Sequence, residues 1–241
     1  MQADLSPELP LKRQSNEYPS EWWGAVGASR TDLTLEHLVE NGTLTQASCS
    51  LLGQSVAIGR SVLIASRESG AGKTTLLTAL LSQLDPSRRR VFVRGSYETF
   101  SFLHGATPTE LALLVNEISP YLQMYCWGES LRRLLIAHRS GYQFLSTIHA
   151  DSAKEVRSLL LPFSSTSIDS LPFADLTIAF ISQKDDGERV HRFVQSIVTV
   201  SLSSEAGVGD DSLLRWQPDL AIPVSATGTA LTVPSDTSRG S

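Results

Sequence analysis

The hydrophobic positions of the chain form short continuous runs that alternate with stretches of helical spacing. A run such as 61–65 is typical of a buried strand, whereas apolar residues three and four positions apart indicate a helix that covers a sheet. The pattern predicts strands over 61–65, 90–93, 121–127, 142–146, 176–181 and 189–200, and helices over 35–39, 45–57, 74–84, 108–118, 130–139 and after Asp151. This alternation favours an α/β fold with a mostly parallel sheet and helices on both faces.

The last two predicted strands flank a turn that ends in Asp186-Gly187. This dipeptide is a strong hairpin signal, because glycine adopts the left-handed backbone of a tight turn at little cost. We therefore expect an antiparallel hairpin at the C-terminal edge of the sheet.

The segment between Pro108 and Pro120 is predicted to be a helix with a capped start. Thr107 stands at the N-cap position, Pro108 at the first helical position, and Glu110 where it can complete a capping box. The apolar residues that follow and support a helix are Leu111, Leu114, Val115 and Ile118.

Both ends of the chain lack this periodicity. Residues 1–30 are polar and contain several prolines, and the residues from 225 onward are rich in Ser, Thr and Gly. We expect a loosely ordered or disordered arm over 1–30, one domain over 31–204 and a largely disordered tail over 205–241.

Composition narrows the class of protein. The chain has 241 residues, of which 41% are hydrophobic and 19% charged, as in soluble globular proteins. The formal net charge of −5 supplies no basic field, so no nucleic-acid partner is expected. Because the sequence shows no membrane-spanning run and no signal-peptide pattern, we expect a cytoplasmic protein, and peripheral association with the inner face of the cell membrane stays open. Cys49 and Cys126 form no disulfide or metal pattern and are expected to be small buried residues.

A glycine-rich segment joins the predicted strand 61–65 to the predicted helix 74–84. It consists of Ser69, Gly70, Ala71, Gly72, Lys73, Thr74 and Thr75. Small residues let backbone N–H groups approach phosphate oxygens, and the positive end of the following helix stabilises the anion. Lys73 is predicted to reach the β- and γ-phosphates, Thr74 to ligate Mg²⁺ and Thr75 to hold the α-phosphate. The segment therefore predicts a nucleoside triphosphate site.

One position departs from the full phosphate-loop pattern. That pattern has Gly or Ala six positions before the lysine, where this chain has Arg67. A bulky residue there either tilts the loop or adds a charge contact. A glycine-rich turn that binds nothing is the alternative to a phosphate site.

Between Leu38 and about Val198 the chain resembles the traffic ATPases of type II and type IV secretion and type IV pilus systems, with most likeness to the tight-adherence (Flp) branch. The passages that carry the resemblance are 38–44, the phosphate loop 70–77, the histidine box 146–152, and 174–176 with 186–190. A histidine box at the right distance from a phosphate loop is more selective than the loop alone. The resemblance covers the C-terminal ATPase domain of that family and implies a RecA-like P-loop core.

The resemblance also implies further site residues. The family has a glutamate, preceded by glycine, at the end of its third core strand, and Gly128-Glu129 fits that pattern. Glu129 is therefore expected to polarise the attacking water. Glu117 is the rival candidate, but it follows a run that reads as helix. His149 would sense the γ-phosphate, and Glu98 matches the last glutamate of the family's acidic box.

Some features of the family are missing. Arg94 and Gly95 stand where acidic residues of that box are expected, the arginine expected shortly after the catalytic glutamate is missing, and the large N-terminal domain has no counterpart in this sequence. These departures leave the binding prediction intact but threaten efficient hydrolysis.

The resemblance implies an ATPase that uses ATP and Mg²⁺ to energise protein secretion or pilus assembly. It also implies a homo-oligomeric ring such as a hexamer, with inner-membrane platform proteins as partners and sites between subunits. The candidates for an arginine that acts in trans are Arg132, Arg133, Arg139 and Arg157.

The sequence leaves three other classes of protein to consider. A degenerate nucleotide-binding regulatory or assembly partner of a full-length secretion ATPase, with little or no hydrolysis, is favoured by the altered acidic box. A small-molecule kinase would need a basic lid for a second substrate, and a nucleic-acid motor gains no support from the acidic net charge.

Overall fold

The computed structural model describes residues 33–163, 176–201, 209–216 and 223–224. The arm predicted over 1–30 lies outside these residues. The predicted tail over 205–241 includes two short described strands, and the domain boundaries stay a prediction.

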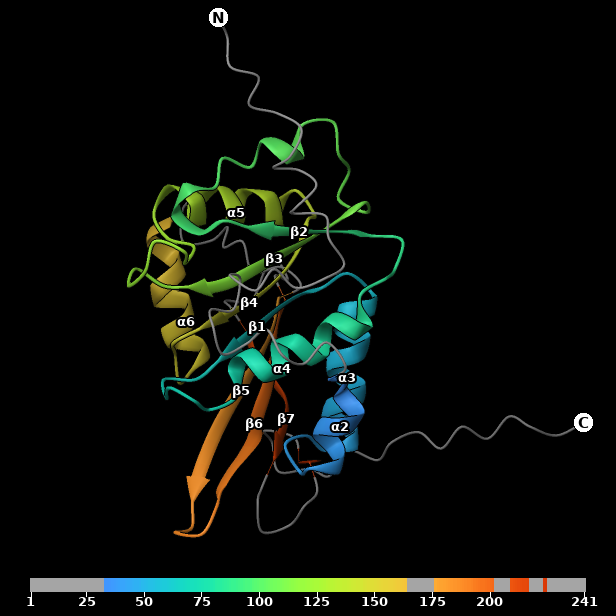
Figure 1. Ribbon diagram of the computed structural model, residues 1–241, viewed down its shortest axis with the longest axis vertical. Helices are drawn as coiled ribbons and strands as arrows, with labels where there is room; N and C mark the ends of the chain where they lie inside the picture. Colours follow the sequence, from blue (N-terminus) through green and yellow to red (C-terminus); the bar gives the residue numbers. More distant parts are fainter. Residues whose placement is uncertain (1–32, 164–175, 202–208, 217–222, 225–241) are drawn as a thin grey trace, which may run out of the picture.

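One eight-stranded sheet, in the order β2-β3-β4-β1-β5-β6-β7-β8, forms the centre of the molecule (Figure 1). The strands are β1 (Ser61–Ala65), β2 (Arg89–Val93), β3 (Leu111–Ile118), β4 (Gln143–Ile148), β5 (Leu176–Asp185), β6 (Val190–Ser201), β7 (Gly209–Trp216) and β8 (Pro223–Val224). The first five strands in this order run parallel, and β5 to β8 are antiparallel. The predicted α/β class and the C-terminal hairpin are confirmed, and β5 and β6 extend beyond the other strands as a long hairpin (Figure 1).

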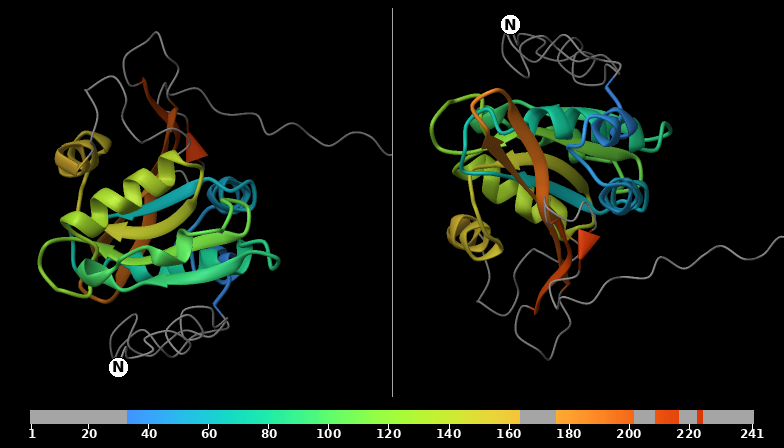
Figure 2. Two further views of the ribbon diagram at one scale, coloured as in Figure 1. Left: turned by 90° about the horizontal axis from the view of Figure 1, so that it is seen from above. Right: turned by 90° about the horizontal axis from the view of Figure 1, so that it is seen from below.

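Helices cover both faces of the sheet (Figure 2). They are α2 (Leu35–Glu40), α3 (Gln46–Ala57), α4 (Lys73–Leu80), α5 (Glu129–Arg139) and α6 (Ala153–Leu160), with 3₁₀ turns η1 (Leu81–Gln83), η2 (Gly95–Tyr97), η3 (Ser101–Leu103) and η4 (Leu161–Phe163). Helices α2, α3 and α4 contribute to one buried cluster, and α5 and α6 to the other. Along β1 the side chains alternate, because successive residues of a strand face opposite sides of a sheet: Leu63 belongs to the second cluster, Val62 and Ile64 to the first.

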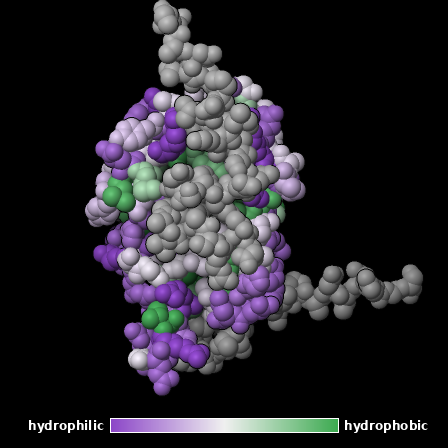
Figure 3. Space-filling view, viewed as in Figure 1, coloured by the Kyte–Doolittle hydropathy of each residue, from purple (hydrophilic) through white to green (hydrophobic). Residues whose placement is uncertain are grey.

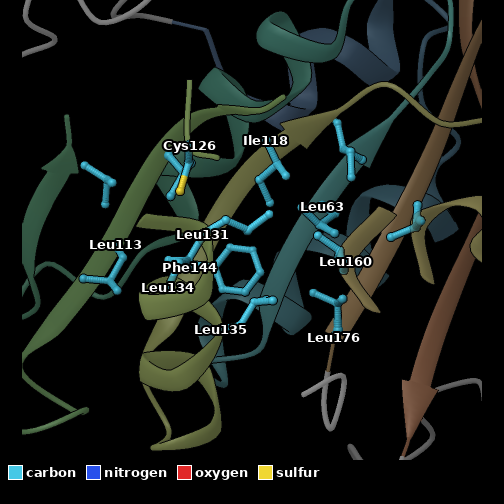
Figure 4. Close-up of a cluster of buried hydrophobic side chains, with 14 of the residues drawn as sticks. Leu63, Leu113, Ile118, Cys126, Leu131, Leu134, Leu135, Phe144, Leu160 and Leu176 are labelled. Atoms are coloured by element: carbon cyan, nitrogen blue, oxygen red, sulfur yellow. The ribbon is translucent and has the colours of Figure 1, made fainter. Parts of the chain in front are cut away.

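Phe144 lies at the centre of the cluster beneath α5 (Figure 4). It is fully buried, and the view shows it beside Leu131, Leu134 and Leu135 of α5. Burial of each such side chain contributes roughly 1.5–3 kcal/mol. Cys126 lies in the same cluster, and burial raises the pKa of its thiol to about 12, as expected of an inert buried cysteine.

The helix predicted between Pro108 and Pro120 is wrong, because the segment forms strand β3. Half of the predicted capping box forms: the N–H of Thr107 donates to Oε2 of Glu110 at 2.6 Å, but the N–H of Glu110 donates to the backbone carbonyl of Thr107 at 3.1 Å and not to its hydroxyl. They close a turn rather than a helix. Leu111 to Val115 are all buried between β2 and β4, and such a continuous apolar run fits a strand covered on both faces.

The strand predicted over 121–127 is also wrong. After β3 the chain forms a loop in which the side chains of Tyr121 and Leu122 are 79% and 51% exposed. Within the described residues, Cys126 is the only part of this loop that pairs with the sheet, through a single bridge to Ile118. The apolar residues of segment 121–127 therefore do not form a core strand.

Exposed large hydrophobic side chains occur singly or in short groups. Outside the grey atoms, hydrophilic residues dominate the face shown in Figure 3. Among the helices that the structure describes, none is long and apolar enough to cross a membrane.

Candidate functional site

The functional side chains meet at the carboxyl edge of three adjacent strands, β3, β4 and β1. The phosphate loop follows β1, His149 follows β4, and Glu117 lies near the end of β3. Parallel strands bring their carboxyl ends to one edge of a sheet, where ligands of open α/β sheets bind. A cavity of about 1010 Å³ opens there, and it is lined by every residue from Ser69 to Leu76 together with Glu117 and His149.

The phosphate loop has the backbone that an anion site requires. Gly70 and Gly72 have φ angles of 76° and 97°, a region that residues with a side chain rarely adopt. Gly72 is the N-cap of α4, so the N–H groups of the first turn point toward the cavity end of the helix. All seven residues predicted to bind the nucleotide line the cavity.

Lys73 is held inside the loop by carbonyl groups. Its side chain is almost buried, and its ammonium donates to the carbonyls of Ser66 at 3.1 Å and Glu68 at 3.0 Å. A third neighbour, Nδ1 of His149, lies 3.5 Å from Nζ. Burial lowers the pKa of Lys73, and the charges of Glu117 and Glu68 oppose that shift. The ammonium is thus a poorly hydrated charge that a phosphate would partner.

Glu117, which the sequence ranked second, is the carboxylate beside Lys73. Its Oε1 lies 3.4 Å from Nε2 of His149, and Glu117 as a whole is 9% exposed. Burial raises the pKa of the Glu117 carboxyl, while His149, Lys73 and a hydrogen bond from Ser119 oppose the shift. A carboxyl of raised basicity in a cleft is a candidate general base.

A β-bulge directs Glu117 into this position. The pairing of β3 with β4 shifts between Leu114 and Glu117, so that β3 carries one extra residue at this point. The hydroxyl of Thr147 donates to the carbonyl of Asn116 at 2.9 Å and fixes the bulged backbone. Bulges re-aim side chains beside functional sites, and here the strand turns one carboxylate toward the phosphate loop.

Glu129 does not end a core strand, contrary to the expectation from sequence. It is the first residue of α5, outside the cavity lining, and its side chain is 53% exposed. Arg132 and Arg133 contact its carboxylate at 2.6 and 2.9 Å. These hydrogen bonds, with that from Arg132 the stronger, lower the pKa of Glu129 to about 2. Its contacts are those of a helix N-terminal carboxylate.

Glu98 is buried but lies outside the lining of this cavity. Its carboxylate accepts hydrogen bonds from the N–H groups of Arg94, Thr99 and Phe100 at 3.1, 2.8 and 3.1 Å. Phe100 has a φ angle of 58°, so these bonds hold a turn that a bulky residue rarely adopts. The structure gives Glu98 contacts that order the chain after β2.

Arg67 adds charge contacts between the start of the loop and acidic side chains. Its N–H donates to Oδ1 of Asp151 at 3.0 Å, and its guanidinium contacts Asp151 and, at 2.7 Å, Glu155. The carbonyl of Arg67 also lies 3.2 Å from Nδ1 of His149. The residue that departs from the usual loop pattern thus ties the start of the phosphate loop to the histidine segment and α6.

Sequence reasoning missed one wall of the cavity. This wall consists of the α2–α3 turn, the hairpin and the loop after β3: Asn41, Gly42, Thr43, Tyr125, Arg189, His191, Arg192 and Phe193. The N–H of Val194 donates to the carbonyl of Thr43 at 2.9 Å and joins the hairpin to the turn. The resemblance had marked 38–44 and 186–190, but no spacing rule could show that they face the phosphate loop.

The oxygen donors present fit a hard cation such as Mg²⁺. Thr74 is partly exposed in the cavity, and the carboxylate of Glu117 lines the same space. Within the described residues no group of three or more His, Cys, Asp or Glu side chains could hold a metal alone.

Comparison with known proteins gives limited similarity. No protein-family model matches the chain, and no curated protein matches its sequence. Among solved structures it is similar to the ATPase DotB of Legionella pneumophila, at 16% identity and a TM-score of 0.41, over 61% of this chain and 47% of that one. It is also similar to the VirB11 ATPase from the Brucella suis type IV secretion system in complex with sulphate, at 19% identity and a TM-score of 0.42, over 66% and 53% of the two chains. The chain spans about half the length of each of these proteins.

Proposed function

We propose that this protein binds ATP with Mg²⁺ and hydrolyses it as the motor subunit of a secretion or pilus-assembly system. The observation that carries the proposal is the meeting of Lys73, Glu117 and His149 at one edge of the sheet, around a glycine-rich loop at a helix N-terminus. The loop N–H groups and the Lys73 ammonium bind the phosphates. Thr74 would hold Mg²⁺, and the ion would supply positive charge to the β- and γ-phosphates.

In the hydrolysis step Glu117 accepts a proton from the attacking water. The water oxygen bonds to the γ-phosphorus, the bond from that phosphorus to the β–γ bridging oxygen breaks, and ADP leaves with the electron pair. The raised pKa of Glu117 increases its basicity, which favours this proton transfer once the carboxyl is ionised. Lys73 stabilises the negative charge on the phosphate oxygens.

His149 couples the reacting end of the site to the loop. Its ring lies within 3.5 Å of Lys73, within 3.4 Å of Glu117 and within 3.2 Å of the Arg67 carbonyl. A γ-phosphate that draws Lys73 away from these partners changes what the imidazole contacts. We propose that His149 reports the presence of that phosphate to the segment held by Arg67.

The wider role follows from the resemblance in sequence. It favours a homo-oligomeric ring, cytoplasmic or at the inner face of the membrane, that works on membrane platform proteins. Proposed candidates for an arginine in trans are Arg132, Arg133, Arg139 and Arg157. Arg132 and Arg133 are engaged with Glu129, so a role in a neighbouring site would require them to leave that carboxylate.

A second candidate is a nucleotide-binding regulatory or assembly partner with little turnover. Glu98 favours it, because the carboxylate that matches the acidic box is bonded to the backbone of its own turn and does not line the cavity. Both candidates bind nucleotide, and they differ in the rate of the chemical step.

Equilibrium binding of ATP with Mg²⁺ tests the shared part of the two candidates. Lys73→Ala is expected to abolish binding, because it removes the buried cation of the loop. Lys154→Ala is the matched control, since Lys154 is exposed on α6 and outside the cavity lining. Equal binding by wild type and Lys73→Ala would refute a phosphate site here. Turnover over a range of protein concentrations then separates a ring-forming ATPase from the partner protein.

A further inference from the structure

The β5–β6 hairpin places a second cation over the phosphate loop. Nε of Arg192 donates to the carbonyl of Gly70 at 2.7 Å. A Cβ atom built on Gly72 would lie 3.2 Å from Cδ of Arg192, so the arginine stem passes directly over the N-cap of α4. Arg192 and the phosphate loop line the same cavity, although 122 positions separate Gly70 from Arg192.

The guanidinium retains donors for a ligand. Arginine carries five N–H donors and stays charged in proteins, and the bond to Gly70 uses only the one on Nε. Within the described residues no carboxylate forms an ion pair with Arg192, whereas Arg67, Arg132 and Arg133 each contact one. A carbonyl oxygen alone does not neutralise a guanidinium, and the planar fork of N–H groups matches phosphate oxygens.

We propose that Arg192 binds the phosphate chain of the nucleotide from within the same chain. This inference rests on the proposed function, and it adds a phosphate contact from the hairpin of the same chain to any arginine that acts from a neighbouring subunit. The N–H groups of the loop surround the α- and β-phosphates, so a cation at Gly70 adjoins that part of the ligand. Nucleotide affinity then depends on the hairpin and not on assembly of a ring.

The test is the Kd of ATP and of ADP, each with Mg²⁺, for wild type, Arg192→Ala, Arg192→Lys and Lys184→Ala. Lys184 is the matched control, because it is an exposed cation of the same hairpin outside the cavity lining. Arg192→Ala is expected to weaken both ligands about 10- to 100-fold, as for a lost charged hydrogen bond. Arg192→Lys should recover part of the affinity, and Lys184→Ala should bind like wild type.

Two further readouts separate a phosphate contact from a structural role. The dependence of Kd on salt should be shallower in Arg192→Ala, because one charge contact is lost, and wild-type affinity should not change with protein concentration.

A Kd of Arg192→Ala within about twofold of the wild-type Kd would overturn the inference. The inference would also be overturned if Arg192→Lys did not recover the affinity and the salt dependence of Kd in Arg192→Ala equalled that of wild type. Arg192 would then only hold the loop. Wild type that binds no nucleotide would refute the proposed function as well. Binding lost in Lys73→Ala but kept in Arg192→Ala would refute this inference alone.

Discussion

The hydroxyl of Thr147 is the most specific link between the fold and the proposed chemistry. It donates to the carbonyl of Asn116, the residue before Glu117, and so fixes the bulge that directs the carboxylate. Thr147→Val removes this hydrogen bond and keeps the volume, the branched Cβ and the strand preference of the side chain. The variant therefore changes the bulge without touching a residue that contacts nucleotide.

The size of the effect follows from burial. Thr147 is 2% exposed and Asn116 is partly buried, so the carbonyl left without its donor is only in part rehydrated. The loss should cost about 1–2 kcal/mol of stability. For a domain of this size that corresponds to a decrease in Tm of about 2–8 °C. If the carboxylate of Glu117 moves by about 1 Å, turnover should fall roughly 10- to 100-fold while nucleotide binding is retained.

Thr177→Val is the matched control for this variant. Thr177 is fully buried on β5, and its hydroxyl donates to Ser55 at 3.3 Å, away from the cavity lining. It should lose stability by a similar amount and keep its turnover. Thermal unfolding and steady-state hydrolysis measure the two effects separately. Equal turnover in Thr147→Val and wild type, at a lowered Tm, would refute the view that the bulge positions Glu117.

Other predictions concern charge at the site. Because burial raises the pKa of Glu117 in the nucleotide-free protein, the acid limb of the pH profile of kcat/KM should lie at higher pH than for an ordinary carboxyl. A raised pKa means that Glu117 stabilises the fold below its unfolded-state pKa, and that this stabilisation is lost as pH rises through its folded-state pKa. The Tm of Glu117→Gln should therefore rise relative to that of wild type as pH increases. A Tm difference that stays constant with pH would contradict this. Arg67→Ala removes two ion pairs whose side chains are 31–65% exposed, and denaturant titrations should show only a small loss of stability, because solvent screens exposed pairs. That loss should shrink at high salt, and a loss independent of salt would exclude the ion pairs as its cause.

Much of the fold follows from local pattern. The predicted strand 61–65 matches β1, and the turn at Asp186-Gly187 joins β5 to β6. Thr107 and Glu110 predict the start of a helix, but the hydrogen bond from the N–H of Thr107 to the Glu110 carboxylate closes a turn before a strand. The choice between helix and strand for the residues that follow depends on burial between β2 and β4, which is a property of the sheet and not of the segment.

The part of the site that consists of consecutive residues could be predicted from the sequence. The phosphate loop has a local pattern, and each of its predicted residues lines the cavity. The sequence favours Glu129 over Glu117 because it predicts a helix where strand β3 forms, and Glu117 lies near the end of that strand. Arg192 carries no local signal, since it reaches Gly70 only through the length and direction of the hairpin.

We propose that Glu117, and not Glu129, accepts the proton of the attacking water. The most direct test is the steady-state rate of ATP hydrolysis by wild type, Glu117→Gln and Glu129→Gln, with ATP binding measured for each. Glu117→Gln should lower turnover about 10²- to 10⁴-fold and keep ATP binding, because the amide fills the same space without accepting the proton. Glu129→Gln should retain turnover close to that of wild type. Loss of turnover in Glu129→Gln with activity kept in Glu117→Gln would contradict the account.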